Sequence, residues 1–336
     1  MIGLPEICAG VMLIALVAYA LLGGADFGAG VWDLLARGER AQRQRDVIAD
    51  AIAPIWEANH VWLIVLVVML FTAFPPAFAV LMTALHIPVT LMLIGIVLRG
   101  TSFVFRKYDS RRDAVQQRWG RLFAMSSVFS PILLGVIAGA ISTGGIRVED
   151  GVVTSGFVAP WLGPFPLAVG VFALTQFAFL AAVYLTLETR DPDLREDFRT
   201  RALASAAAVG VVAFAVLLLA RSHSPIVWED LTAGPAAVTL HLVTGAAAVG
   251  AILALIVRRW RTAAALAALQ IALILVGWGL ALGPWLVPGE LTIRDAAAPD
   301  SVLLLLLVVL GGGSLILLPA FAYLYLVFKR RNIFPG

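Results

Sequence analysis

The stretch AIAPIWEANHVWLI, residues 51–64, decides how this chain folds. It reads as part of a membrane-spanning helix, yet it places Glu57, Asn59 and His60 in the middle of an apolar run. On insertion scales a carboxylate at the bilayer centre costs about 2.5–3.5 kcal/mol, so such groups face a bundle interior, a water-filled path or a partner. We therefore expect Glu57 to serve a function.

Composition extends this interpretation to the whole chain. The sequence is 61% hydrophobic and only 13% charged, whereas soluble domains carry about a quarter charged residues. The basic residues lie in short runs between apolar segments, the pattern of cytoplasmic membrane loops, so no nucleic-acid partner is expected. The single cysteine, Cys8, excludes an internal disulfide and a cysteine-ligated cluster. The first apolar run has no basic segment before it, which favours a retained helix over a signal peptide.

The apolar segments predict an all-α integral membrane protein in a single polytopic domain, residues 1–336. A span needs roughly 20 mostly apolar residues. Nine segments meet this requirement: about 5–35, 49–73, 77–104, 119–142, 164–187, 202–220, 235–257, 262–283 and 301–328. An odd number of spans places the two termini on opposite sides of the membrane.

The distribution of Lys and Arg predicts which loops face the cytoplasm, because these residues collect in cytoplasmic loops. All but four of the 24 Lys and Arg residues follow the odd-numbered spans. Arg147, Arg221 and Arg294 lie in the opposite loops, and Arg99 lies inside a span. The expectation is a multi-pass protein of the bacterial cytoplasmic (inner) membrane with its N-terminus outside and its C-terminus in the cytoplasm.

The spacing of the spans also permits an internal duplication. Four spans within 1–145 and four within 160–285 would repeat in the same orientation, followed by a last helix at 301–328. This arrangement predicts two four-helix bundles and one extra helix.

Three ionisable residues fall in the inner half of the first three spans. Asp26 lies in GGADFGAG, residues 23–30, and Arg99 lies near the cytoplasmic end of the third span. At 1.5 Å per residue, Glu57 is expected about 10 Å or more into the second span. One interpretation is an ion-pair network that locks three helices together. The other is a path for protons, with Glu57 as its deepest acid.

The histidines offer weaker signals for a metal or haem. Glu57 and His60 form the E-x-x-H spacing of di-iron bundles, but no second motif with further glutamates accompanies it. A haem needs only one axial histidine, so haem ligation stays open in principle. We expect hydrogen-bonded core positions for His86 and His241, a solvated His223, and no metal ligand in this chain.

Three ordered motifs carry a resemblance to a known family. They are GGADFGAGVWDLL at 23–35, AIAPIWEANHVWLI with the following LFTAFP at 70–75, and VLRGTSFVFR at 97–106. Together they resemble subunit II of the cytochrome bd family of quinol oxidases, which reduce oxygen to water. The resemblance is specific over the first third of the chain and rests on topology over the rest.

The resemblance implies a heterodimer in which haems b and d belong to subunit I and none to this chain. It implies a cytoplasmic proton route through Asp26, Glu57, Arg99 and His60, and oxygen access near Trp62. Ubiquinol or menaquinol would be the electron donor. A small accessory subunit, a bound lipid and a quinone remain open.

The chain departs from the family pattern at two positions. Gly23 stands where relatives often have an acid, and Glu57 stands where they commonly have Asp. The first departure suggests that the route has one carrier fewer or uses water. The alternative function is a proton-coupled secondary transporter with a midplane acidic site at Glu57.

Overall fold

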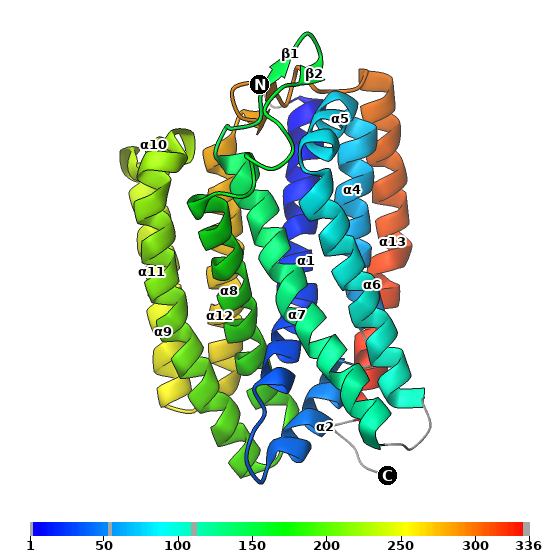
Figure 1. The fold of residues 1–336 in the computed structure, drawn as a ribbon, viewed down its shortest axis with the longest axis vertical. Helices are drawn as coiled ribbons and strands as arrows, with labels where there is room; N and C mark the ends of the chain where they lie inside the picture. Colours follow the sequence, from blue (N-terminus) through cyan, green and yellow to red (C-terminus); the bar gives the residue numbers. More distant parts are fainter. Residues whose placement is uncertain (1–2, 53–55, 109–112, 332–336) are drawn as a thin grey trace.

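The computed structural model of the chain describes residues 3–52, 56–108 and 113–331. Long helices run nearly side by side along one axis (Figure 1), as expected where a bilayer leaves backbone groups no partner outside the helix. Among the described residues, nine helical stretches are long and apolar enough to span a membrane, which confirms the predicted fold class. The helices that contain them are α1 (Leu4–Leu34), α3 (Trp56–Asn59) continued by α4 (Val61–Ala73), α6 (His86–Tyr108), α7 (Asp113–Ser142), α8 (Pro164–Glu188), α9 (Pro192–His223), α11 (Gly234–Ile256), α12 (Trp260–Leu282) and α13 (Asp300–Arg331).

The structure describes the second span from Trp56 onward. Residues 49–73 were expected as one helix; residues 49–52 end helix α2 (Ala41–Ile52), and the apolar stretch found among the described residues runs from Trp56 to Ala73. Residues 53–55 between them lie outside the described part of the chain.

The third span is shorter than the expected 77–104. A short helix, α5 (Pro75–Ala84), comes first, and α6 then starts at His86. Pro88 explains the break, because in a continuous helix its ring would clash with the carbonyl of Ala84, four residues earlier, and it has no N–H to donate there. Proline is tolerated in the first turn of a helix, where Pro88 lies in α6.

The helices form two groups with one helix outside them. Helices α1, α4, α6 and α7 make one bundle, and α8, α9, α11 and α12 make the other. The bundles meet where α1 and α7 pack on α8, while α13 lies beside α1 and α4 (Figure 1). This is the predicted pair of bundles with an extra helix; the internal duplication itself stays a prediction.

Glycines permit the close contact between the bundles. A Cβ at Gly28 would lie 1.8 Å from the carbonyl oxygen of Phe177 in α8, and one at Gly24 would meet the Phe177 ring at 2.5 Å. A Cβ at Gly135 of α7 would lie 2.5 Å from the carbonyl oxygen of Val169 and 2.7 Å from Cα of Gly170 in α8. Small residues at such crossings are typical of helix packing in membranes, because they let backbones approach.

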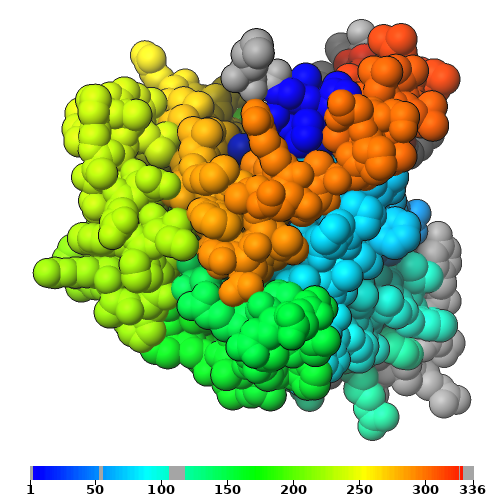
Figure 2. All heavy atoms as spheres, turned by 90° about the horizontal axis from the view of Figure 1, so that it is seen from above, coloured from blue at the N-terminus to red at the C-terminus, as the bar shows by residue number. Residues whose placement is uncertain are grey.

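Loops cover the end of the molecule at which α1 begins. Two short antiparallel hairpins lie there, β1 (Val148–Glu149) with β2 (Val152–Val153) and β3 (Trp285–Val287) with β4 (Leu291–Thr292), beside α10 (Pro225–Thr232). Figure 2 views this end, where the segment around 285–300 lies across the centre. The main-chain N–H of Val148 donates to Oε2 of Glu290 at 3.2 Å, which ties the two hairpins together.

Candidate functional site

Helix α1 carries the central acid of the site. Asp26 lies eight residues before the end of α1, which is about 12 Å along the axis at 1.5 Å per residue. Its side chain is only 5% exposed, because α1 packs against α4, α7 and α8 on different sides. The sequence places a carboxyl group deep in the first bundle.

Four elements meet at Asp26 through hydrogen bonds. Asn59 of α3 donates its side-chain Nδ2 to Asp26 Oδ2 at 2.7 Å. Arg99 of α6 donates Nη2 to the main-chain oxygen of Asp26 at 2.9 Å and Nε to Ser127 Oγ of α7 at 3.1 Å. Ser127 in turn donates to the carbonyl of Phe123 at 2.7 Å. We call Asp26, Asn59, Arg99 and Ser127 the polar cluster.

Aromatic rings enclose the cation of this polar cluster. The Arg99 guanidinium lies 4.9 Å from the Phe27 ring centre and 5.1 Å from that of Phe123, and the residue is 1% exposed. The negative faces of aromatic rings attract a cation, and a buried charge needs such compensation together with hydrogen bonds. Arg99 is therefore held by two directional bonds and two ring faces at once.

Glu57 is not buried as the sequence suggested. It is exposed on the described chain, whereas Asp26 is buried. Residues 53–55 lie outside the described part of the chain, so the depth of Glu57 in the second span stays a prediction. Of the two acids, Asp26 is the one enclosed by the bundle.

His60 lies at the junction of α3 and α4, among aromatic side chains. Its ring centre is 5.8 Å from that of Tyr19, 6.2 Å from that of Trp56 and 6.2 Å from that of Phe27. The sequence prediction that His60 joins the other candidates in one region is therefore consistent with the fold. Tyr19 was not among the predicted residues.

The remaining histidines are hydrogen-bonded but do not occupy the predicted core positions. His86 Nδ1 lies 2.9 Å from the carbonyl of Thr83, and His241 Nδ1 lies 2.8 Å from that of Ala237. Both side chains are exposed on the described chain, although the His86 ring also contacts that of Phe157, with ring centres 5.0 Å apart.

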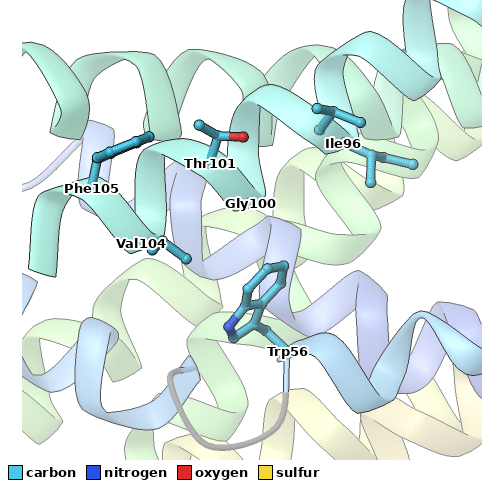
Figure 3. A pocket seen from close by; sticks show the side chains of 7 residues that line it. Trp56, Ile96, Gly100, Thr101, Val104 and Phe105 are labelled. Atoms are coloured by element: carbon cyan, nitrogen blue, oxygen red, sulfur yellow. The ribbon is translucent and has the colours of Figure 1, made fainter. Parts of the chain in front are cut away.

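Two further features flank the polar cluster. Trp62 of α4 is half-buried and stacks on Phe321 of α13, with ring centres 6.0 Å apart. On the side of α6, an open hollow of about 480 Å³ is lined by Trp56 and by α6 residues including Gly100 and Val104. Figure 3 shows the Trp56 indole pointing toward Gly100 across this hollow, and Gly100 leaves room for the ring because it has no side chain.

The residues around the hollows do not fit a haem. The hollow beside Trp56 and a second one near Arg40 and Asp197 are lined, in the described part of the chain, by no His, Met, Cys or Tyr side chain. These are the side chains that ligate haem iron. Searched within the same described residues, no group of three His, Cys, Asp or Glu side chains could hold a metal ion.

The comparison with known families decides the identity of the chain. The family model described as cytochrome bd terminal oxidase subunit II matches residues 4–328. The chain belongs to this family. With nine membrane-length apolar helices among its described residues and with bacterial relatives, this subunit II is a bacterial membrane protein.

Individual relatives give the same assignment. The chain is 29% identical over 208 residues to cytochrome bd-I ubiquinol oxidase subunit 2 of Escherichia coli (strain K12), which is 60% of this chain and 53% of the relative. It is 27% identical over 167 residues to a putative cytochrome bd menaquinol oxidase subunit II of Bacillus subtilis (strain 168), 50% of this chain and 47% of the relative. The matches thus span about half the length of these relatives.

A solved structure supports the fold. A chain in the structure of bd oxidase from Geobacillus thermodenitrificans superposes with a TM-score of 0.80 at 21% identity, covering 97% of this chain and 98% of that chain. At this identity the likeness establishes the arrangement of helices alone.

Sequence reasoning missed two members of the polar cluster as site residues. Asn59 stands two positions after Glu57, so its amide was visible in the quoted stretch, but only the fold shows that it bonds to Asp26. Ser127 gives no signal at all, because serine is common in membrane helices and its partner Arg99 is 28 positions away.

Proposed function

We propose that this chain works as subunit II of a quinol:oxygen oxidoreductase, in a heterodimer with a haem-bearing subunit I, and that it supplies protons to that partner from the cytoplasmic side. Relatives named as ubiquinol and menaquinol oxidase subunits support the reaction class. The observation that carries the proton role is the buried carboxyl of Asp26, hydrogen-bonded to Asn59 beside a buried Arg99. The family match does not favour the transporter alternative.

The reaction requires such a route. Two quinols release four electrons and four protons, and one oxygen molecule takes up four electrons and four protons to form two waters. Protons used inside a low-dielectric protein must travel through groups that take and release one. A haem bound in the partner would supply the site for oxygen and pass the quinol electrons to it.

The residues of this chain divide the work by exposure. Glu57, exposed on the described chain, collects protons at the entrance. Asp26 receives them inside the bundle, where the amide of Asn59 fixes the direction of its carboxyl. Arg99 binds the main chain of Asp26 and thereby sets the position of that turn of α1. His60 lies beside this path, against Phe27.

Trp62 keeps its proposed role near an oxygen path. It lies between α4 and α13, where its indole stacks on Phe321. Oxygen is apolar and concentrates in the lipid, so an entry between two lipid-facing helices suits it better than one through the polar cluster.

The test uses the complex purified through this chain. We expect a haem-bearing partner to copurify, which a transporter would not bring along.

In that complex Asp26→Asn should lower quinol oxidase turnover per haem by at least about tenfold, the scale of a lost acid–base group, and Glu57→Gln should lower it less. The matched control is Asp230→Asn, because Asp230 is exposed at the opposite end of the molecule. Wild-type turnover in a fully haem-loaded Asp26→Asn complex would contradict the proton role.

A further inference from the structure

We propose that Tyr19 continues the proton route beyond Asp26, with its hydroxyl and His60 forming the next hydrogen-bonding station at the middle of the membrane. The inference rests on the proposed function and extends it to two residues with no assigned role past Asp26. It is carried by the geometry of α1 and by one buried polar atom on each of two side chains whose rings are in contact.

Tyr19 shares a face of α1 with Asp26. The two residues are seven positions apart, which is two helical turns, and therefore lie one above the other about 10 Å apart along the axis. Tyr19 is the middle residue of α1 and is 2% exposed. Its ring stands edge-on to that of His60, with centres 5.8 Å apart.

The hydroxyl of Tyr19 and Nδ1 of His60 are both buried without a hydrogen-bond partner among the described residues. Buried polar atoms in native proteins are nearly always paired, with protein or with an ordered water. A buried water typically makes about three hydrogen bonds. Two side chains in ring contact, both beside Phe27 and both with unused hydrogen-bonding capacity, provide what such a water requires.

Gly23 fixes the position of the tyrosine ring. A Cβ at Gly23 would lie 2.8 Å from Cε2 and 3.0 Å from Cδ2 of Tyr19. The ring therefore lies over Gly23, one turn further along α1, in the space that any other residue at position 23 would need. Gly23 and the His60 ring together restrict where the tyrosine ring can lie.

The chemistry needs no net charge on the phenol. A proton released by the Asp26 carboxylic acid passes through a hydrogen-bonded water to the Tyr19 oxygen, and the original hydroxyl proton leaves to the next acceptor. A hydroxyl can do this because it donates and accepts at once. His60 supplies a second group with both capacities. The charged groups nearest this step are Asp26 and Arg99.

The first experiment replaces Tyr19 by Phe in the full haem-loaded complex. Phenylalanine keeps the ring against Gly23 and His60 and removes only the hydroxyl. We expect turnover per haem to fall at least about tenfold and the solvent deuterium isotope effect on turnover to increase. Tyr184→Phe is the matched control, because Tyr184 is a partly buried tyrosine on α8, and it should change neither.

A second variant tests the position of the Tyr19 ring instead of the chemistry of its hydroxyl. Gly23→Ala leaves the hydroxyl present but forces the Tyr19 ring aside, and it should reproduce the fall in turnover. Wild-type turnover in Tyr19→Phe would overturn the inference, and so would a loss of turnover that only follows a loss of haem, which would make Tyr19 structural. Asp26→Asn, measured alongside, separates this inference from the proposed function. If Asp26→Asn also keeps wild-type turnover, the proposed function itself fails.

Discussion

At the scale of single residues, Arg99 is the side chain on which the polar cluster depends most. Its guanidinium donates to Asp26 O and to Ser127 Oγ in two fixed directions while two ring faces cover it. A lysine ammonium is a point charge on a flexible stem and cannot reproduce the planar fork.

We therefore predict that Arg99→Lys lowers the free energy of unfolding by about 1.5–3 kcal/mol, the range for hydrogen bonds to a charged group. The measurement is the thermal unfolding midpoint of the purified complex. Arg221→Lys is the matched control, because Arg221 is exposed at the opposite end of the molecule. Equal midpoints for both variants would show that the fork geometry of Arg99 is dispensable.

The site was predictable from the sequence only in part. Charged residues in apolar runs are conspicuous, so Asp26 and Arg99 were found, and the fold brings them together. The exposure of Glu57 was not predictable, because it depends on which face of the second span turns toward the bundle. Asn59 became a site residue only through its contact with Asp26, which joins positions 33 apart.

At the scale of elements, the crossing of α1 over α8 controls how the two bundles fit. Gly28 has the tightest contact, since an added Cβ would lie 1.8 Å from the Phe177 carbonyl oxygen and 2.3 Å from its carbon. A backbone carbonyl cannot rotate away as a side chain can, so the helices themselves would have to separate.

Gly28→Ala should therefore destabilise the subunit by about 3 kcal/mol or more, at the upper end of overpacking costs, and lower the yield of intact complex in membranes. Gly210→Ala serves as control, because nothing lies within 4 Å of a Cβ at Gly210 on α9. If the two variants accumulate equally, α1 and α8 are less closely packed than the structure indicates.

Element prediction succeeded where apolar length was the only signal. The spans at 119–142, 164–187, 235–257 and 262–283 agree with the helices within two residues or, for α7, with its apolar part. The prediction of helix bounds failed where a proline interrupts an apolar run, as before α6. Hydropathy does not register that proline lacks a main-chain N–H. The extension of α9 back to Pro192 was missed for a related reason: Asp191 caps the helix through Asp193 N–H, and the charged first turn looked like a loop.

At the scale of the whole molecule, charge divides the bundle into two different ends. The end where α1 begins has hairpins and few basic residues, with Arg147 and Arg294 engaged by Glu290 and Glu6. The other end has the connection after α1, where Arg40 pairs with Asp197 of α9. The basic end should face the cytoplasm, because Lys and Arg near span ends resist transfer across the membrane.

Cysteine labelling can test this orientation with little background. Cys8 is the chain's single cysteine and is fully buried, so the unmodified chain should not react with a membrane-impermeant maleimide. Val152→Cys places a thiol at a position that is 64% exposed in the hairpin end, and Glu39→Cys places one on the exposed basic end. In spheroplasts we expect the thiol at position 152 to be labelled and the one at position 39 to react only after permeabilisation. Both should react in detergent, which shows that each thiol is reachable. The reverse pattern would place the basic end at the outer surface, and a proton route that enters from that end could then no longer draw on the cytoplasm.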